Sequence, residues 1–192
     1  MKDNALKVRY LGVLAFSIYV VTIVGANWMI VHVGAPAAGG HLLPVGFGLM
    51  APSGVYLAGA AFIARDFVQR ALGTKFGFIA IVVGAIVSAF VSTPTLALAS
   101  GLTFLVSEST DFLIFTPLQT KNFPMAVFVA GVSSDVVDSF LFLTLAHIPL
   151  REAFLGQVVG KTWVTLVGAV VSYLLRRSSA FGISTPGMSK AT

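Results

Sequence analysis

Long apolar stretches alternate with short polar ones along the chain. A helix needs about 20 consecutive, mostly apolar residues to cross a bilayer. Six stretches meet or approach this length, and we expect each to form a helix. Their predicted limits are residues 8–33, 42–64, 76–91, 95–118, 123–147 and 153–175. The pattern therefore predicts an all-α integral membrane protein built as a bundle of six transmembrane helices.

Glycine, proline and charged residues separate the predicted helices. The expected connections are a glycine-rich loop at 34–40, a charged loop holding Arg65, Asp66, Arg70 and Lys75, a proline break at 92–94, a short loop at 119–122 and a turn at 149–152. Proline removes a backbone donor and restricts the residue before it, so it ends or breaks helices. We expect residues 1–177 to form one transmembrane domain and residues 178–192 to form a disordered cytoplasmic tail.

Composition and charge support a membrane location. Hydrophobic residues make up 57% of the 192 residues and charged residues only 10%, whereas soluble domains average about 25% charged residues. The first apolar run is longer than the core of a signal peptide, which spans roughly 7 to 15 residues, so we expect it to be retained as a helix. We expect a multi-pass protein of the inner (plasma) membrane.

The net charge of +5 indicates orientation in a membrane, because the basic residues gather in the predicted loops and tails. If the N-terminus is cytoplasmic, the outer loops hold Arg151 alone. The cytoplasmic side then holds Lys2, Lys7, Arg9, Arg65, Arg70, Lys75, Lys121, Arg176, Arg177 and Lys190. The excess of Lys and Arg in cytoplasmic loops sets topology, so both termini are expected in the cytoplasm.

Five ionisable residues fall inside predicted spans. They are Glu108, Asp111, Asp135, Asp138 and Lys161. A charge at the centre of a bilayer costs about 2.5–3.5 kcal/mol on insertion scales, and such residues usually mark a functional site. The four acids are more than half of the chain's seven. The alternative is that they only join helices through hydrogen bonds.

The spacing of these residues places them on single helix faces, because residues three or four apart are neighbours on a helix. The three stripes are Phe104, Glu108, Asp111 and Phe115; Phe128, Asp135, Asp138 and Phe142; and Lys161, Thr165, Gly168 and Ser172. Carboxylates accept N–H donors and phenyl rings stack on flat rings. A cavity lined by both suits a planar, nitrogen-rich molecule. Four carboxylates against one lysine also predict that some acids are protonated or paired.

Two further sets of residues bear on the bundle. Asn27 lies deep in the first span and is expected to bond either a ligand or a neighbouring helix. Gly77, Gly84, Ser88 and Ser92 form a stripe of small residues in the third span, which we interpret as a helix-packing surface.

Several classes of protein are disfavoured by what the sequence lacks. It has no cysteine, which excludes disulfides and thiolate sites. It has no Walker A loop, no regular arginine repeat of a voltage sensor and no Gly-x-Gly-Asp around Asp135 or Asp138. His32 and His41 lack a second ligand cluster, so no metal is expected. We therefore expect a protein that is not an enzyme, needs no cofactor and binds no nucleic acid.

With these residues located, the chain resembles the queuosine precursor transporter family, also called the vitamin-uptake-like or VUT family, over residues 25–177. The segments that carry the resemblance are Ala26-Asn27, Pro52 to Phe62 and Asp66 to Gly73, Ala99-Ser100 with Ser107-Glu108 and Asp111-x-x-Ile114-Phe115, Ser133-Ser134 with Asp138-Ser139-Phe140-x-Phe142, and Lys161. Two positions depart from the family pattern. Ser139 stands where Thr is usual, and Glu108 stands where many members have Gln.

The resemblance implies uptake of a 7-deazaguanine, such as 7-cyano-7-deazaguanine or its aminomethyl relative, into the cytoplasm for tRNA modification. The N–H donor edge of a deazaguanine fits a carboxylate acceptor. The predicted substrate-binding residues are Asn27, Glu108, Asp111, Asp135, Asp138 and Lys161. Two alternatives stay open: a substrate-binding subunit of an energy-coupling-factor vitamin transporter, which needs an ATPase module, and a membrane scaffold without a ligand. The expected partners are the deazapurine and the lipid bilayer, and a homodimer also stays open.

Overall fold

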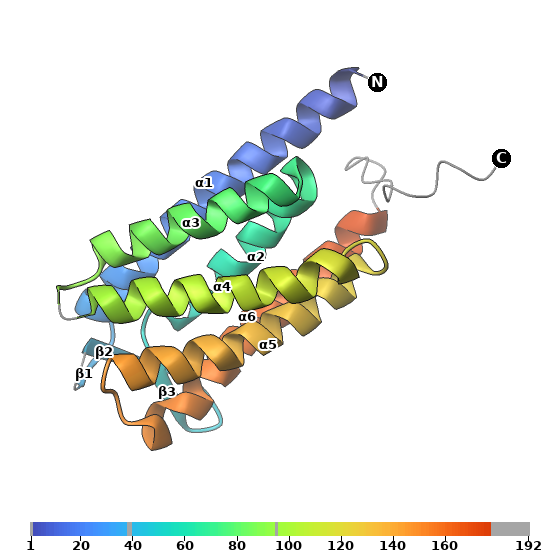
Figure 1. The fold of residues 1–192 in the computed structure, drawn as a ribbon. Coiled ribbons are helices and arrows are strands. Elements are labelled where there is room, and N and C mark those ends of the chain that lie inside the picture. The colour runs from blue at the N-terminus through green and yellow to red at the C-terminus, as the bar shows by residue number, and fades with distance from the viewer. Residues whose placement is uncertain (1, 38–39, 95, 178–192) are drawn as a thin grey trace.

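Six helices form the body of the protein in a computed structural model that describes residues 2–37, 40–94 and 96–177 (Figure 1). They are α1 (Lys2–His32), α2 (Val55–Leu72), α3 (Thr74–Val91), α4 (Ala97–Leu118), α5 (Phe123–Leu145) and α6 (Leu150–Arg177). Neighbours along the chain run antiparallel, so the start of α1 and the end of α6 lie at the same end of the bundle. The predicted tail at 178–192 lies outside the described residues.

Five of these helices are long and apolar enough to cross a membrane. The qualifying segments are Leu6–His32, Thr74–Val91, Ala97–Leu118, Phe123–Leu145 and Ala153–Leu175. Helix α2 does not qualify, because its 18 residues include Arg65, Asp66 and Arg70. The prediction of helices is thus confirmed, while a sixth apolar span is not.

The limits predicted for the second helix were wrong. We expected a helix over 42–64 and a charged loop after it, but α2 begins at Val55 and continues to Leu72. The earlier residues cannot start a helix, because Pro44 and Pro52 lack backbone donors and Gly46 and Gly48 adopt positive φ angles of 101° and 72°. The later charges stay helical because their side chains find partners inside the bundle, and Arg65 and Asp66 are buried.

A small antiparallel sheet occupies the chain between α1 and α2, where the sequence predicted only a loop and a helix start. Its strands are β1 (Ala35–Ala37), β2 (Gly40–Gly46) and β3 (Leu49–Pro52), in the order β1-β2-β3. The sheet lies at the end of the bundle away from the chain termini (Figure 1). It is anchored to α6, since Trp163 Nε1 donates to the carbonyl oxygen of Val45 at 3.1 Å. Strand β3 also packs closely on α6 at Gly156, where a Cβ would lie 1.9 Å from the carbonyl oxygen of Met50.

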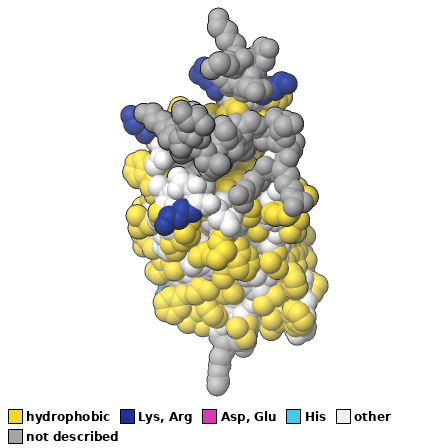
Figure 2. Space-filling view, turned by 90° about the vertical axis from the view of Figure 1, so that its right-hand side faces the viewer, with side chains coloured by type: hydrophobic (Ala, Val, Ile, Leu, Met, Phe, Trp, Pro, Cys, Tyr) yellow, Lys and Arg dark blue, Asp and Glu magenta, His cyan; other side chains and the backbone are white. Residues whose placement is uncertain are grey.

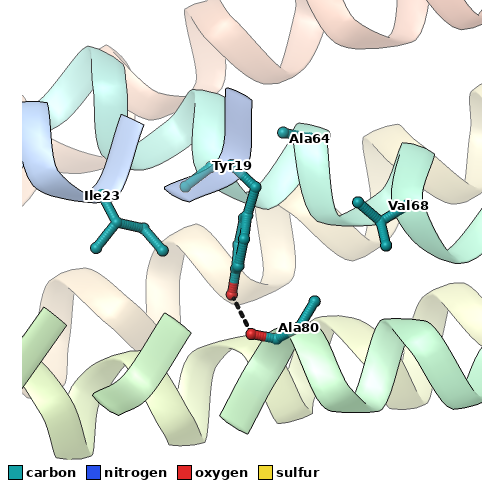
Figure 3. Close-up of a cluster of buried hydrophobic side chains, with 6 residues drawn as sticks. Tyr19, Ile23, Ala64, Val68 and Ala80 are labelled. Atoms are coloured by element: carbon teal, nitrogen blue, oxygen red, sulfur yellow. Dashed lines mark hydrogen bonds between the residues drawn. The ribbon is translucent and has the colours of Figure 1, made fainter. Parts of the chain in front are cut away.

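The α1–α2–α3 side of the bundle packs around Tyr19, which is fully buried. Its hydroxyl donates to the carbonyl oxygen of Ala80 in α3 at 2.9 Å, and Ile23, Ala64 and Val68 surround the ring (Figure 3). A Cβ on Gly84 would lie 2.0 Å from this hydroxyl. Small residues let membrane helices approach closely, so the packing interpretation of the α3 stripe agrees with these contacts.

On the face shown in Figure 2, apolar side chains cover most of the described surface, and Lys and Arg side chains lie in its upper part. Exposed examples include Leu113, Phe90 and Val167. A surface of this kind needs lipid around it, because lipid removes apolar groups from water. The basic end is the one at which α1 starts and α2 ends (Figure 1).

Candidate functional site

A cavity lies between the helices on the side of the bundle nearer the sheet. All six helices contribute to its lining, together with Pro52 and Gly54 at the end of the sheet. The residues most relevant to binding are Asn27, Thr103, Phe104, Asp138, Phe142 and Lys161. The centres of water-sized molecules have about 70 Å³ available to them, which is enough for several waters. A two-ring heterocycle would require the cavity to widen.

An ion pair between Asp138 of α5 and Lys161 of α6 forms part of the cavity wall. Lys161 is 1% exposed, and its ammonium group also donates to Gln157 Oε1 at 2.9 Å and to Ser139 Oγ at 3.2 Å. The side chain of Asp138 is 13% exposed. Its Oδ1 accepts a hydrogen bond of 3.0 Å from Ser107 of α4. The pair therefore joins three helices and leaves a carboxylate within reach of the cavity.

Two uncharged polar residues also line the cavity. Asn27 accepts a hydrogen bond of 2.6 Å from Ser92 Oγ and donates to the carbonyl oxygen of Ile23 at 3.0 Å. Thr103 is 2% exposed, and its hydroxyl has no hydrogen-bond partner among the described residues. Thr103 therefore offers the cavity an unused donor and acceptor. An unpaired buried hydroxyl costs free energy, and a ligand that bonded it would remove that cost.

A second polar group surrounds Arg65 of α2, further toward the basic end. Its guanidinium donates to Glu108 Oε2 at 2.8 Å, to Gln69 Oε1 at 2.9 Å and to Asp111 Oδ1. It also lies 3.1 Å from Asp66 Oδ1. We call Arg65, Asp66, Glu108 and Asp111 the arginine cluster. All four side chains are almost wholly buried, and Arg65 additionally lies over the ring of Phe115.

The arginine cluster contains residues that sequence reasoning placed in a loop. Arg65 was counted among the basic residues of a cytoplasmic loop, and that assignment was wrong because the residue is 0% exposed within α2. The i, i+4 spacing of Arg65 and Gln69 is the signal that marks a shared helix face, and their side chains do bond. Removing Arg65 from the loop count still leaves Lys7, Arg9, Arg70, Lys75 and Lys121 at the basic end.

The six predicted substrate-binding residues divide into three places. Asn27, Asp138 and Lys161 line the cavity. Glu108 and Asp111 belong to the arginine cluster, and Asp111 also accepts from Ser134 at 3.1 Å. Asp135 accepts from Thr165 of α6 at 3.0 Å. The structure pairs Asp138 with Lys161. Asp111 was expected to meet these two residues, but it pairs with Arg65. Substrate binding by any of the six stays a prediction.

Comparison with known proteins bears on what this arrangement does. The model of a family described as "Putative vitamin uptake transporter" matches residues 74–175, which is more than half of the chain. The chain belongs to this family. No curated protein and no solved structure is significantly similar to it. The matched range runs from the start of α3 to residue 175 near the end of α6, and so includes Glu108, Asp111, Asp135, Asp138 and Lys161.

Membership in the vitamin uptake transporter family, together with five apolar helices, makes the chain a multi-pass membrane protein of a transport family. The family is one of transporters. Pockets between bundle helices are common places for small-molecule binding. The cavity offers a carboxylate, an ammonium group, the Thr103 hydroxyl and two phenyl rings, which suit a small planar molecule with both donors and acceptors.

Proposed function

We propose that this member of the family carries a 7-deazaguanine precursor of queuosine, such as 7-cyano-7-deazaguanine or 7-aminomethyl-7-deazaguanine, across the inner membrane into the cytoplasm. The observation that carries the proposal is the Asp138–Lys161 pair in the cavity wall. It sets an anionic acceptor and a cationic donor side by side, which matches the donor edge and the carbonyl oxygen of a guanine-like ring.

The chemistry of recognition follows from this pairing. Asp138 accepts the neighbouring N–H groups of the ring. Lys161 donates to its carbonyl oxygen after releasing Gln157 or Ser139, because its three donors are all bonded in this structure. Binding of the two-ring molecule also widens the cavity. Phe104 and Phe142 line the same cavity, and phenyl rings favour stacking against a flat heterocycle. Thr103 and Asn27 supply further hydrogen bonds at the periphery of the ring.

The position of the cavity fits an uptake direction. Its lining reaches Ile30 and Pro52 at the sheet end, while the arginine cluster lies between the cavity and the basic end. If the basic end faces the cytoplasm, the cavity belongs to the outer half of the protein. Substrate then enters from the sheet side, and transport requires the bundle to open toward the basic end.

The test is binding followed by transport with the purified chain. A thermal-shift screen against 7-cyano-7-deazaguanine, guanine, hypoxanthine and riboflavin should show the largest rise in Tm with the deazaguanine, because a ligand that binds only the folded state stabilises it. Liposomes containing the chain alone should then take up the labelled compound faster than empty liposomes. No shift with any deazaguanine would overturn the substrate. Uptake that depends on an added ATPase module would support an energy-coupling-factor system instead.

A further inference from the structure

The arginine cluster contains more carboxyl groups than its single cation can balance. Within the described residues, Arg65 alone supplies positive charge to Asp66, Glu108 and Asp111. Each of the three acids is at most 1% exposed. Buried carboxylates that crowd one another cannot all stay ionised. The cluster is therefore expected to hold a proton.

The geometry singles out Asp66 and Asp111. A carboxylate oxygen from each contacts the same guanidinium nitrogen, Nη2 of Arg65. Because the two buried carboxyl groups share one nitrogen of a single cation, they crowd each other, and such crowding favours a proton on one of them. Asp66 Oδ1 in addition lacks a hydrogen-bond donor among the described residues.

The surroundings contain few other groups that could neutralise the pair. Tyr19 of α1 is buried, and its hydroxyl donates to the carbonyl oxygen of Ala80. From α5, Ser134 donates to Asp111 at 3.1 Å, and Asp135 and Asp138 are further carboxyl groups on the same helix. Lys161 of α6 is paired with Asp138. The described part of α3 carries Lys75 as its ionisable residue, at its exposed first turn.

The cluster is joined to the cavity by a short series of contacts. Arg65 donates to Glu108 at 2.8 Å. Ser107, the residue before Glu108 in α4, donates to Asp138 at 3.0 Å. A substrate that engages Asp138 changes the charge that the neighbouring acids experience. Proton binding at the cluster and substrate binding in the cavity can therefore influence each other, as linked equilibria do.

We propose that Asp66, held against Asp111 by Arg65, is the proton-carrying group of a substrate–proton symport. Asp66 takes up one proton when the cavity side is open and releases it toward the basic end in the same cycle that carries one substrate molecule. Only the O–H bond of the carboxyl group forms and breaks. This inference rests on the proposed function for the identity of the cargo, while the proton site itself is independent of it.

The proton on the carboxyl group can be detected directly, without any substrate. Infrared spectra of the full-length protein in lipid should contain the carbonyl band of a protonated carboxyl group at neutral pH, and Asp66→Asn should remove that band or shift it. Asparagine resembles the neutral aspartic acid in shape and charge, so this variant is expected to fold. A spectrum without such a band, or a band that neither Asp66→Asn nor Asp111→Asn changes, would overturn the proton site.

The coupling is tested in liposomes with 7-cyano-7-deazaguanine and the membrane potential clamped to zero. One proton per neutral substrate predicts accumulation of up to about tenfold for each pH unit of outside acidity. Asp66→Asn should abolish this accumulation while keeping exchange at equal pH within about threefold of the unaltered protein. Exchange that proceeds without any response to the gradient, or full accumulation by Asp66→Asn, would refute the symport. Absence of both exchange and ligand binding in the unaltered protein would instead refute the cargo, while the infrared result decides the proton site.

Discussion

Lys161 reaches from α6 to the carboxylate of Asp138 on α5, and both side chains line the cavity between the six helices. The lysine is buried and the aspartate is partly open to the cavity. A buried pair is costly to break, because one unbalanced charge is left behind. The two residues therefore serve the fold and the proposed binding site at once, and experiments must separate these roles.

Asp138→Asn is expected to weaken binding of 7-cyano-7-deazaguanine about ten- to hundredfold. The change replaces one acceptor oxygen by a donor, and a hydrogen bond to a charged group contributes about 1.5–3 kcal/mol. Titration calorimetry in detergent measures the Kd. An unchanged Kd in folded protein would remove Asp138 from the site.

Lys161→Met supplies the matched comparison. Alone it should lower stability by about 3–5 kcal/mol, because Asp138 keeps its charge without a partner. The double variant Asp138→Asn with Lys161→Met should recover part of that loss, since neither charge remains, yet should still bind the ligand poorly. Denaturation and binding measured on all four proteins form a double-mutant cycle. Recovery of binding together with stability would show that the pair is structural.

The two aspartates of the arginine cluster are expected to respond differently to neutralisation. Asp66→Asn imitates a protonated acid and should change stability by less than about 1 kcal/mol. Asp111 accepts from Arg65 with one oxygen and from Ser134 with the other. Asp111→Asn removes the charge and leaves one acceptor oxygen for the two donors, and should cost about 1.5–3 kcal/mol. Tm values of both variants at neutral pH decide the matter, and equal losses would argue against a proton on Asp66.

Packing of α1 on α3 gives a prediction unrelated to charge. Gly84→Ala would place a methyl group 2.0 Å from the Tyr19 hydroxyl, so it should cost about 1–3 kcal/mol as overpacking. Tyr19→Phe keeps the ring and loses the hydrogen bond to Ala80, at a cost of about 1 kcal/mol. If Gly84→Ala proves neutral while Tyr19→Phe is destabilising, the helices must separate more easily than their contact suggests.

Orientation in the membrane remains a prediction from charge. Lys7, Arg9, Arg70, Lys75 and Lys121 lie at one end of the bundle, and that end should face the cytoplasm. A reporter fused after Arg177 should be active only in the form that works in the cytoplasm. Activity of a periplasmic reporter at the same position would invert the topology and the direction assigned to the cavity.

Hydropathy predicted most of the fold because lipid imposes a simple length rule on helices. The limits expected for the last four helices lie within three residues of the observed limits of α3, α4, α5 and α6. The same rule failed at residues 42–72. An apolar strand pair such as β2 and β3 resembles the start of a membrane helix in composition, and a charged helix resembles a loop.

The candidate site was predictable only in its components. Helical spacing placed Asp138 and Lys161 on inward faces, and the structure pairs them. Spacing within one helix carries no information on which faces meet across the bundle, so the pairing of Asp111 with Arg65 was not foreseen. Arg65 was overlooked because a basic residue beside a span is usually a topology signal. Its partners on α4 lie more than 40 positions away in the chain.

The charged character of α2 has a consequence for biogenesis. Helix α2 alone is not hydrophobic enough to insert readily into the bilayer, because it carries three charged residues. Each of them costs about 2.5–3.5 kcal/mol at the bilayer centre. Two of the carboxylates that balance Arg65 belong to α4, which is synthesised later. A nascent chain that ends before α4 therefore lacks them. Stable placement of α2 must follow the arrival of α4, so assembly of the bundle proceeds out of the order in which its helices leave the ribosome.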